Sequence, residues 1–184
     1  MAEIDRNTFV DGDWILSKIR DIAICKSFDC GHKDLNDYFH NDIVAHKAEL
    51  LSQSYYLHMR QFPDIVFALL DFCNDAVKLN SLKKYLEEIG LAEEKQHYRH
   101  LPAVKLTRLG VAKEHHDEDV GTYLLNMVKK FFTTDNRTGC RFITVDSYIE
   151  ATGFYTKNGF SLLTEKDRNE KTRTMYYDLK RLTG

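Results

Sequence analysis

Residues 106–125 read LTRLGVAKEHHDEDVGTYLL, and this stretch predicts a strand, a short connection and a helix. The apolar stripe that runs from Val120 to Phe132 is typical of an amphipathic helix. Where a strand leads into a helix in this way, the first helical N–H groups have no partners and the helix dipole favours an anion. The stretch therefore predicts a place that can hold a phosphate group, although most such units bind nothing.

The strand in this stretch changes the parity of its apolar residues. Val104 and Leu106 have one parity, whereas Leu109 and Val111 have the other. A β-bulge near residues 107–108 explains the change, because one extra residue shifts the alternation. A strand that is buried on both faces explains it equally well, so both interpretations stay open.

Outward from this stretch, the pattern predicts a mixed α/β fold. We expect strands at residues 18–24, 52–59, 64–72, 104–112, 141–147, 159–163 and 174–179. We expect helices at residues 34–46, 79–91, 120–132 and 149–157, the first of them capped by Asp34, and a loop at residues 93–100. Residues 52–59 and 64–72 should pair as an antiparallel hairpin. No linker rich in Gly, Ser or Pro divides the chain, so residues 1–184 should form a single domain.

Composition narrows the function classes. The chain has 184 residues, 43% of them hydrophobic, which suffices for a folded core. A net charge of −2 gives no general attraction to nucleic acid or to an anionic membrane, so neither is an expected partner. No apolar run approaches the length of a membrane span or forms a signal peptide, and we expect a cytoplasmic protein.

The cysteine and histidine patterns predict no metal site. Cys25, Cys30, Cys73 and Cys140 have no C-x-x-C spacing and are expected to be reduced thiols. His97 and His100 lie three residues apart, but no third ligand is evident, which favours a solvated loop over a metal centre.

Three motifs point to one family. Residues 151–160, ATGFYTKNGF, resemble the A-x-x-F-Y-x-x-x-G-F signature of the GCN5-related N-acetyltransferase (GNAT) superfamily, and Val145-Asp146-Ser147 is similar to the V-D-A step of one branch. Residues 106–125 resemble the acetyl-CoA motif, in which Arg/Gln-x-x-Gly-x-Gly/Ala follows a strand. Residues 28–36, FDCGHKDLN, resemble the F-x-C-G-x-x-x-L-N opening of acetyltransferase toxins from toxin–antitoxin pairs. The resemblance implies a mixed, mostly antiparallel sheet with a central strand–loop–helix–strand unit for acetyl-CoA and a splayed, bulged fourth strand.

The same resemblance implies roles for individual residues. Tyr155 would protonate the departing CoA thiolate, which suits a phenol that stays protonated at neutral pH. The alternative is that Tyr155, one of 10 tyrosines, packs a helix onto the sheet. Backbone groups of Leu109 and Val111 would pair with the pantetheine arm. The pyrophosphate would be held by the following residues: His116, Asp117, Asp119, Val120, Gly121 and Thr122.

The loop departs from the family pattern in its charge. His116 stands where the motif has Arg or Gln, Asp119 stands where it has its first glycine, and Gly121 matches. An aspartate adds bulk and a negative charge beside a negative ligand, or its carboxylate caps the helix and occupies the amides that phosphate would use. The three acids at residues 117–119 could weaken binding by roughly ten- to a thousandfold. Protonated His115 and His116 would partly offset this effect.

The sequence thus predicts an N-acetyltransferase that uses acetyl-CoA as co-substrate, without a metal, and an amine acceptor that is a small molecule or a protein. Direct attack in a ternary complex is the expected mechanism. Candidates for the general base are Asp146, Glu150, His116 or a water relay. One alternative is a binding module that keeps the fold but has lost the pyrophosphate site. Another is a toxin-like aminoacyl-tRNA acetyltransferase, which the acidic balance disfavours. A homodimer is compatible with the sequence.

Overall fold

The computed structural model describes residues 8–89, 98–134 and 139–183. The chain forms two compact units, one of residues 1–73 with 107–131 and the other of residues 74–106 with 132–184. Two long strands, β4 (Ala68–Lys78) and β5 (His100–Val111), contribute residues to both units. Each unit is described by itself below, and the single domain over residues 1–184 stays a prediction.

The first unit opens with strands that the sequence did not predict. β1 (Thr8–Asp11) and β2 (Trp14–Lys18) form a hairpin whose turn places Gly12 at a φ of 61°, a conformation that glycine adopts without strain. The strand expected at residues 18–24 is wrong, because β2 ends at Lys18 and a 3₁₀ turn follows at Ile22–Cys25. The Asp21 carboxylate accepts a hydrogen bond from the Ala23 amide and so caps this turn.

The predicted central hairpin of this unit is confirmed, with a longer connection. β2 pairs with β3 (Gln53–Met59), and β3 pairs with β4, all antiparallel. β4 begins at Ala68 and continues to Lys78, whereas the expected strand covered residues 64–72. The register matches Leu57 with Ala68, so the segment between the strands forms a wide turn.

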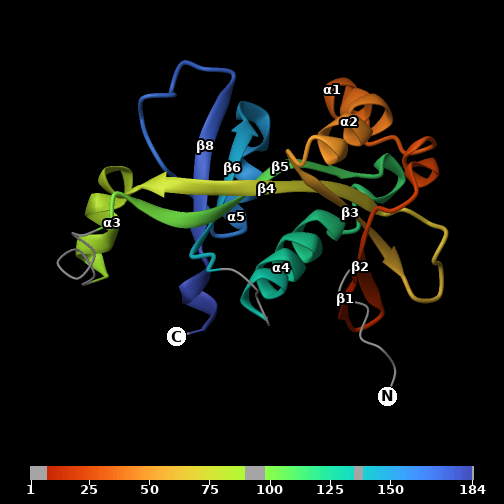
Figure 1. The fold of residues 1–184 in the computed structure, drawn as a ribbon, viewed down its shortest axis with the longest axis horizontal. Coiled ribbons are helices and arrows are strands. Elements are labelled where there is room, and N and C mark those ends of the chain that lie inside the picture. The colour runs from red at the N-terminus through yellow and green to blue at the C-terminus, as the bar shows by residue number, and fades with distance from the viewer. Residues whose placement is uncertain (1–7, 90–97, 135–138, 184) are drawn as a thin grey trace. The chain divides into compact units, whose positions relative to one another are not determined.

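Helices cover both faces of the first unit's strands (Figure 1). On one face lie α1 (Lys33–Asp37), a π-helical turn (Tyr38–Asp42) and α2 (Ile43–Ala48), which together confirm the predicted helix. Its N-cap is His32, and Asp34 lies in the first turn instead. On the other face, α4 (Val120–Thr133) confirms the clearest predicted helix. Its residue Phe131 packs edge-on against Tyr55 of β3, with 5.5 Å between ring centroids.

Burial along β5 places the change of parity earlier than expected. Leu101 and Ala103 are buried, and then Val104 and Leu106 are buried, so the alternation shifts between residues 103 and 104. Leu109 and Val111 are half-buried. The expected shift at residues 107–108 is therefore wrong, and a bulge in this strand stays a prediction.

The second unit contains the parallel pair that the crossover predicted. β5 pairs with β6 (Phe142–Tyr148) in parallel, and β8 (Thr172–Asp178) pairs antiparallel with both β6 and β7 (Ser161–Leu162). The helices are α3 (Lys83–Glu88), preceded by a 3₁₀ turn at Leu79–Leu82, and α5 (Thr152–Lys157), preceded by a 3₁₀ turn at Ile149–Ala151; a third turn, Leu179–Leu182, follows β8. Pairing across the two units' strands is antiparallel everywhere except between β5 and β6, as expected. The predicted loop at residues 93–100 lies outside the described residues up to 97.

Two further expectations concern thiols and membranes. The four cysteines are free, as predicted, and burial raises the pKa of the Cys25 and Cys140 thiols to about 11. Within the described part of the chain, no helix has the length and apolar character that crossing a membrane requires.

Candidate active site

The residues predicted to hold the cofactor all belong to the first unit. Leu109 and Val111 lie near the end of β5, and a 3₁₀ turn at Lys113–His115 leads to α4. The exposed residues of the connection are His116, Asp117, Glu118 and Asp119, whereas Val120 is buried and Gly121 and Thr122 are half-buried in the first turn of α4. We call residues 112–122 the cofactor loop.

Asp119 keeps the backbone conformation of the glycine that it replaces. Its φ is 54°, in the left-handed region that favours glycine, and the only other non-glycine residue with positive φ among those described is Leu50. Aspartate tolerates this region better than most residues, because its short side chain interferes little with the backbone. The path of the loop therefore matches the glycine motif even though its side chain does not.

The start of α4 leaves amides available to an anion. The Asp119 carbonyl accepts the Tyr123 amide at 3.0 Å, so the amides of Val120, Gly121 and Thr122 precede the first helical hydrogen bond. In residues 8–89, 98–134 and 139–183, no hydrogen bond reaches the Asp119 carboxylate, so it does not cap the helix. The amides that a pyrophosphate would use are thus not taken by this side chain.

Both histidines of the loop are engaged within it. His115 Nδ1 lies 2.9 Å from Glu118 Oε2, and its ring packs on Phe67 with 4.4 Å between centroids. His116 Nε2 lies 2.9 Å from the Val111 carbonyl oxygen. Because a carbonyl only accepts, this nitrogen carries a hydrogen. The Val111 carbonyl, expected to face pantetheine, therefore already has one donor.

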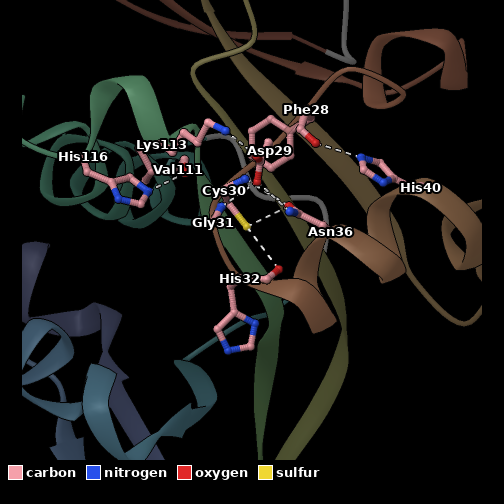
Figure 2. A network of polar contacts seen from close by, with 10 residues as sticks. All are labelled: Phe28, Asp29, Cys30, Gly31, His32, Asn36, His40, Val111, Lys113 and His116. Carbon is pink, nitrogen blue, oxygen red and sulfur yellow. Dashed lines mark hydrogen bonds and ion pairs between the residues drawn. The ribbon is translucent and has the colours of Figure 1, made fainter.

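The toxin-like segment Phe28–Asn36 lies against the end of β5, and we call it the N-terminal clamp (Figure 2). A Cβ on Gly110 would lie 3.1 Å from Cys30 Cβ and Sγ, so this close approach requires glycine. The Asn36 side-chain oxygen accepts from the Cys30 amide at 3.0 Å and from its thiol at 3.1 Å. The motif residues Cys30 and Asn36 thus hold the clamp in shape and do not face the loop.

Tyr155 lies in α5 of the second unit and is 7% exposed. Its ring packs edge-on against Phe154 and Phe160, with centroids 5.2 Å and 5.4 Å away. Its hydroxyl makes no hydrogen bond to any described residue, and burial raises its pKa, so the proton stays on the oxygen at neutral pH. Packing and a free hydroxyl occur together, which leaves both predicted roles standing.

The candidates for the general base differ in their partners. The Asp146 carboxylate pairs with Lys105 and accepts from Thr174 Oγ1, so it is already occupied. His116 donates to Val111. Glu150 is exposed and has no partner among the described residues. Across those residues no group of His, Cys, Asp and Glu side chains is arranged to hold a metal; His97 lies outside them.

Sequence reasoning missed Asp29 and Lys113, whose side chains join the N-terminal clamp to the cofactor loop at 2.7 Å. The toxin-like motif marked the segment that contains Asp29 but treats that position as variable. No signal in the sequence singled out Lys113, because a lone lysine in a charged loop is ordinary.

Comparison with known folds and families gives consistent matches. The structure is similar to a bacterial toxin (TM-score 0.70, 16% identity, covering 92% of this chain and 93% of that one). It is also similar to AtaT complexed with acetyl-methionyl-tRNAfMet (0.68, 21%, 93% and 98%). A third match is a variant of KacT in which a tyrosine is replaced by phenylalanine (0.67, 18%, 93% and 98%). At these identities the likeness shows the fold, and the sequence has no significant match among curated proteins.

The family is shown by a family model. The acetyltransferase (GNAT) domain matches residues 74–180, more than half of the chain, and this range includes β5, the cofactor loop and Tyr155. The GNAT resemblance of the sequence motifs is thereby confirmed. The chain belongs to the GNAT family of acetyltransferases and is an acyl-CoA-dependent N-acetyltransferase.

Proposed function

We propose that the chain transfers an acetyl group from acetyl-CoA to an amine by direct attack within a ternary complex. The observation that carries the proposal is the positive φ of Asp119, because it preserves the glycine-like path of a pyrophosphate loop without the glycine. The free amides of Val120, Gly121 and Thr122 would bind the pyrophosphate. The amide of Val111 and backbone groups of Leu109 would pair with the pantetheine arm.

The chemical step follows from the groups available. The amine nitrogen attacks the thioester carbonyl carbon, the new C–N bond forms, and the C–S bond breaks. The Tyr155 hydroxyl donates its proton to the departing thiolate and regains one from solvent. The proton of the amine leaves to Glu150 or to water, since Asp146 is held by Lys105.

The charge of the loop sets a modest cofactor affinity. Glu118 is partnered by His115, so Asp117 and Asp119 are the acids that face solvent without a partner among the described residues. Screening by salt reduces the repulsion between exposed carboxylates and phosphate. We therefore propose weakened but retained acetyl-CoA binding, rather than the binding module that has lost its cofactor.

Three classes of acceptor follow as candidates: small amines, protein amines and the α-amine of an aminoacyl-tRNA. The last is favoured by AtaT, whose structure contains acetyl-methionyl-tRNAfMet, and is disfavoured by this chain's net charge of −2. Solved relatives also include toxins bound to an antitoxin or to antitoxin and DNA, which makes a protein partner a proposal for this chain. We place small or protein amines first on the charge argument.

Initial-rate kinetics test this proposal. The three acceptor classes are presented with acetyl-CoA, and release of the free CoA thiol is followed while both substrates are varied. Intersecting reciprocal plots for one class are expected from direct attack in a ternary complex. Parallel plots would indicate a covalent acetyl-enzyme and contradict direct attack. Release of CoA with no class of amine would contradict the proposed acceptor.

A further inference from the structure

The N-terminal clamp holds the cofactor loop through one residue, Asp29 (Figure 2). The Asp29 carbonyl accepts from the Lys113 amide at 3.0 Å, and its Oδ2 accepts from Lys113 Nζ at 2.7 Å. Its other carboxylate oxygen, Oδ1, accepts from the Gly31 amide at 2.8 Å and from Asn36 Nδ2 at 2.7 Å. One side chain therefore fixes the clamp internally and binds the first residue of the 3₁₀ turn.

The clamp also approaches the other end of this turn. A Cβ on Gly31, which has a φ of 76°, would lie 3.9 Å from His116 Cε1. His116 in turn donates to the Val111 carbonyl. Lys113 and His116 are thus both placed by contacts outside α4, and the residues between His116 and α4 take their direction from them.

The charge state of this contact is favourable. The hydrogen bond from Lys113, followed by those from the Gly31 amide and Asn36, holds the pKa of the Asp29 carboxyl well below its usual range. The same pair raises the pKa of Lys113, so both groups are charged at neutral pH. A charge-assisted hydrogen bond of this kind is shorter and more directional than a neutral one.

We propose that Asp29 is a positioning residue for the cofactor: by holding Lys113 it keeps the amides of the cofactor loop in the arrangement that pyrophosphate requires. This role rests on the proposed function, because it needs acetyl-CoA to bind at that loop. Asp29 does not touch the ligand and acts through Lys113. The proposal also gives the toxin-like segment a purpose, which is to carry Asp29 to the end of β5.

The size of the effect is bounded by the contact itself. Lys113 and Asp29 are 55% and 41% exposed, and an exposed ion pair changes an equilibrium by at most about fivefold. A contact can shift ligand affinity only by as much as it distinguishes the ordered loop from other loop conformations. Breaking the pair should therefore raise the Kd for CoA by about fivefold and leave the chemical step alone.

The test is a double-mutant cycle on Asp29→Asn and Lys113→Met. The asparagine keeps an oxygen for the Gly31 amide but presents an NH₂ group to Lys113, and the methionine keeps the lysine's apolar stem. Asp37→Asn is the matched control, because it breaks the Lys33–Asp37 pair of 2.6 Å on α1, in which neither residue belongs to the loop. The readouts are the Kd for CoA by titration calorimetry, and KM for acetyl-CoA compared with kcat.

The proposal predicts that both single variants raise the Kd and KM about fivefold, that the double variant is no worse than either one, and that kcat stays within about twofold. The Asp37→Asn control should match the wild type. Unchanged CoA affinity in Asp29→Asn, or additive effects in the double variant, would overturn the positioning role while leaving the proposed function intact. A wild type that binds no CoA would instead overturn the proposed function, and this role with it.

Discussion

The cofactor loop and the tyrosine of α5 are built in opposite ways. The loop is exposed and charged, and it keeps its path through backbone contacts and a few polar side chains such as His116 and Lys113. Tyr155 is buried between two phenylalanines, and only its hydroxyl lacks a partner among the described residues. The difference teaches that the loop can be changed to alter affinity without disturbing a core, whereas at Tyr155 one oxygen atom separates chemistry from packing.

The largest effect is expected for Tyr155→Phe. The substitution keeps the ring contacts and removes the proton donor, so kcat should fall by about 10²–10⁴. Because the hydroxyl makes no hydrogen bond to the described residues, the free energy of unfolding should change by no more than about 0.5 kcal/mol. Steady-state kinetics and urea unfolding of the same preparation measure the two quantities.

The affinity for acetyl-CoA serves as the internal control for this variant and should stay within about twofold of the wild type. Full activity in Tyr155→Phe would remove the tyrosine from the mechanism. A variant that fails to fold would favour the role of Tyr155 in packing.

A smaller effect, of the opposite kind, is expected for Asp119→Gly. The change removes a like charge near the pyrophosphate and allows closer approach, so the Kd for CoA should fall by about five- to tenfold. Stability should change little, because glycine relieves the strain of a positive φ but adds conformational entropy to the unfolded chain. Titration calorimetry measures the affinity.

Leu50→Gly is the matched control for this prediction. Leu50 has a φ of 57° and is 91% exposed, so the change relieves the same backbone strain away from the loop. It should leave CoA affinity unchanged. Equal affinities in the wild type and Asp119→Gly would mean that the Asp119 carboxylate points away from the ligand.

The smallest effect concerns alkaline pH. The acid form of Tyr155 is the one that donates, and burial raises its pKa above the ordinary value of 10. Ionisation of this residue should therefore cause no loss of kcat below about pH 10. A pH–kcat profile of the wild type checks this. An alkaline limb near pH 8 that is absent from the residual activity of Tyr155→Phe would contradict the buried environment described for this hydroxyl.

Elements that carry a strong periodic pattern could be predicted from the sequence. The stripe of α4 and the short β-rich run of β6 were placed within a residue or two, because burial of one helix face or of both strand faces leaves a clear pattern. The β1–β2 hairpin was missed because its strands are short and half-exposed, and the isoleucines at residues 19–24 suggested a strand where Asp21 instead caps a turn.

The candidate site was predictable as far as its motifs extend. The Phe-Tyr and Gly-Phe pairs marked Tyr155, and the strand–loop–helix pattern marked the amides of α4. The left-handed backbone of Asp119 could not be predicted, because aspartate is compatible with several conformations. The contact between Asp29 and Lys113 joins residues 84 positions apart, and no local pattern encodes such a pair.

Titration of the wild-type chain with acetyl-CoA tests the central claim most directly, since the claim is that an acidic loop with a glycine-like path still binds the cofactor. We expect saturable binding of one acetyl-CoA per chain and a rise in melting temperature. At a ligand concentration 100 times the Kd, binding should add about 2.7 kcal/mol to the free energy of unfolding. No heat of binding and no rise in melting temperature at millimolar acetyl-CoA would contradict the account.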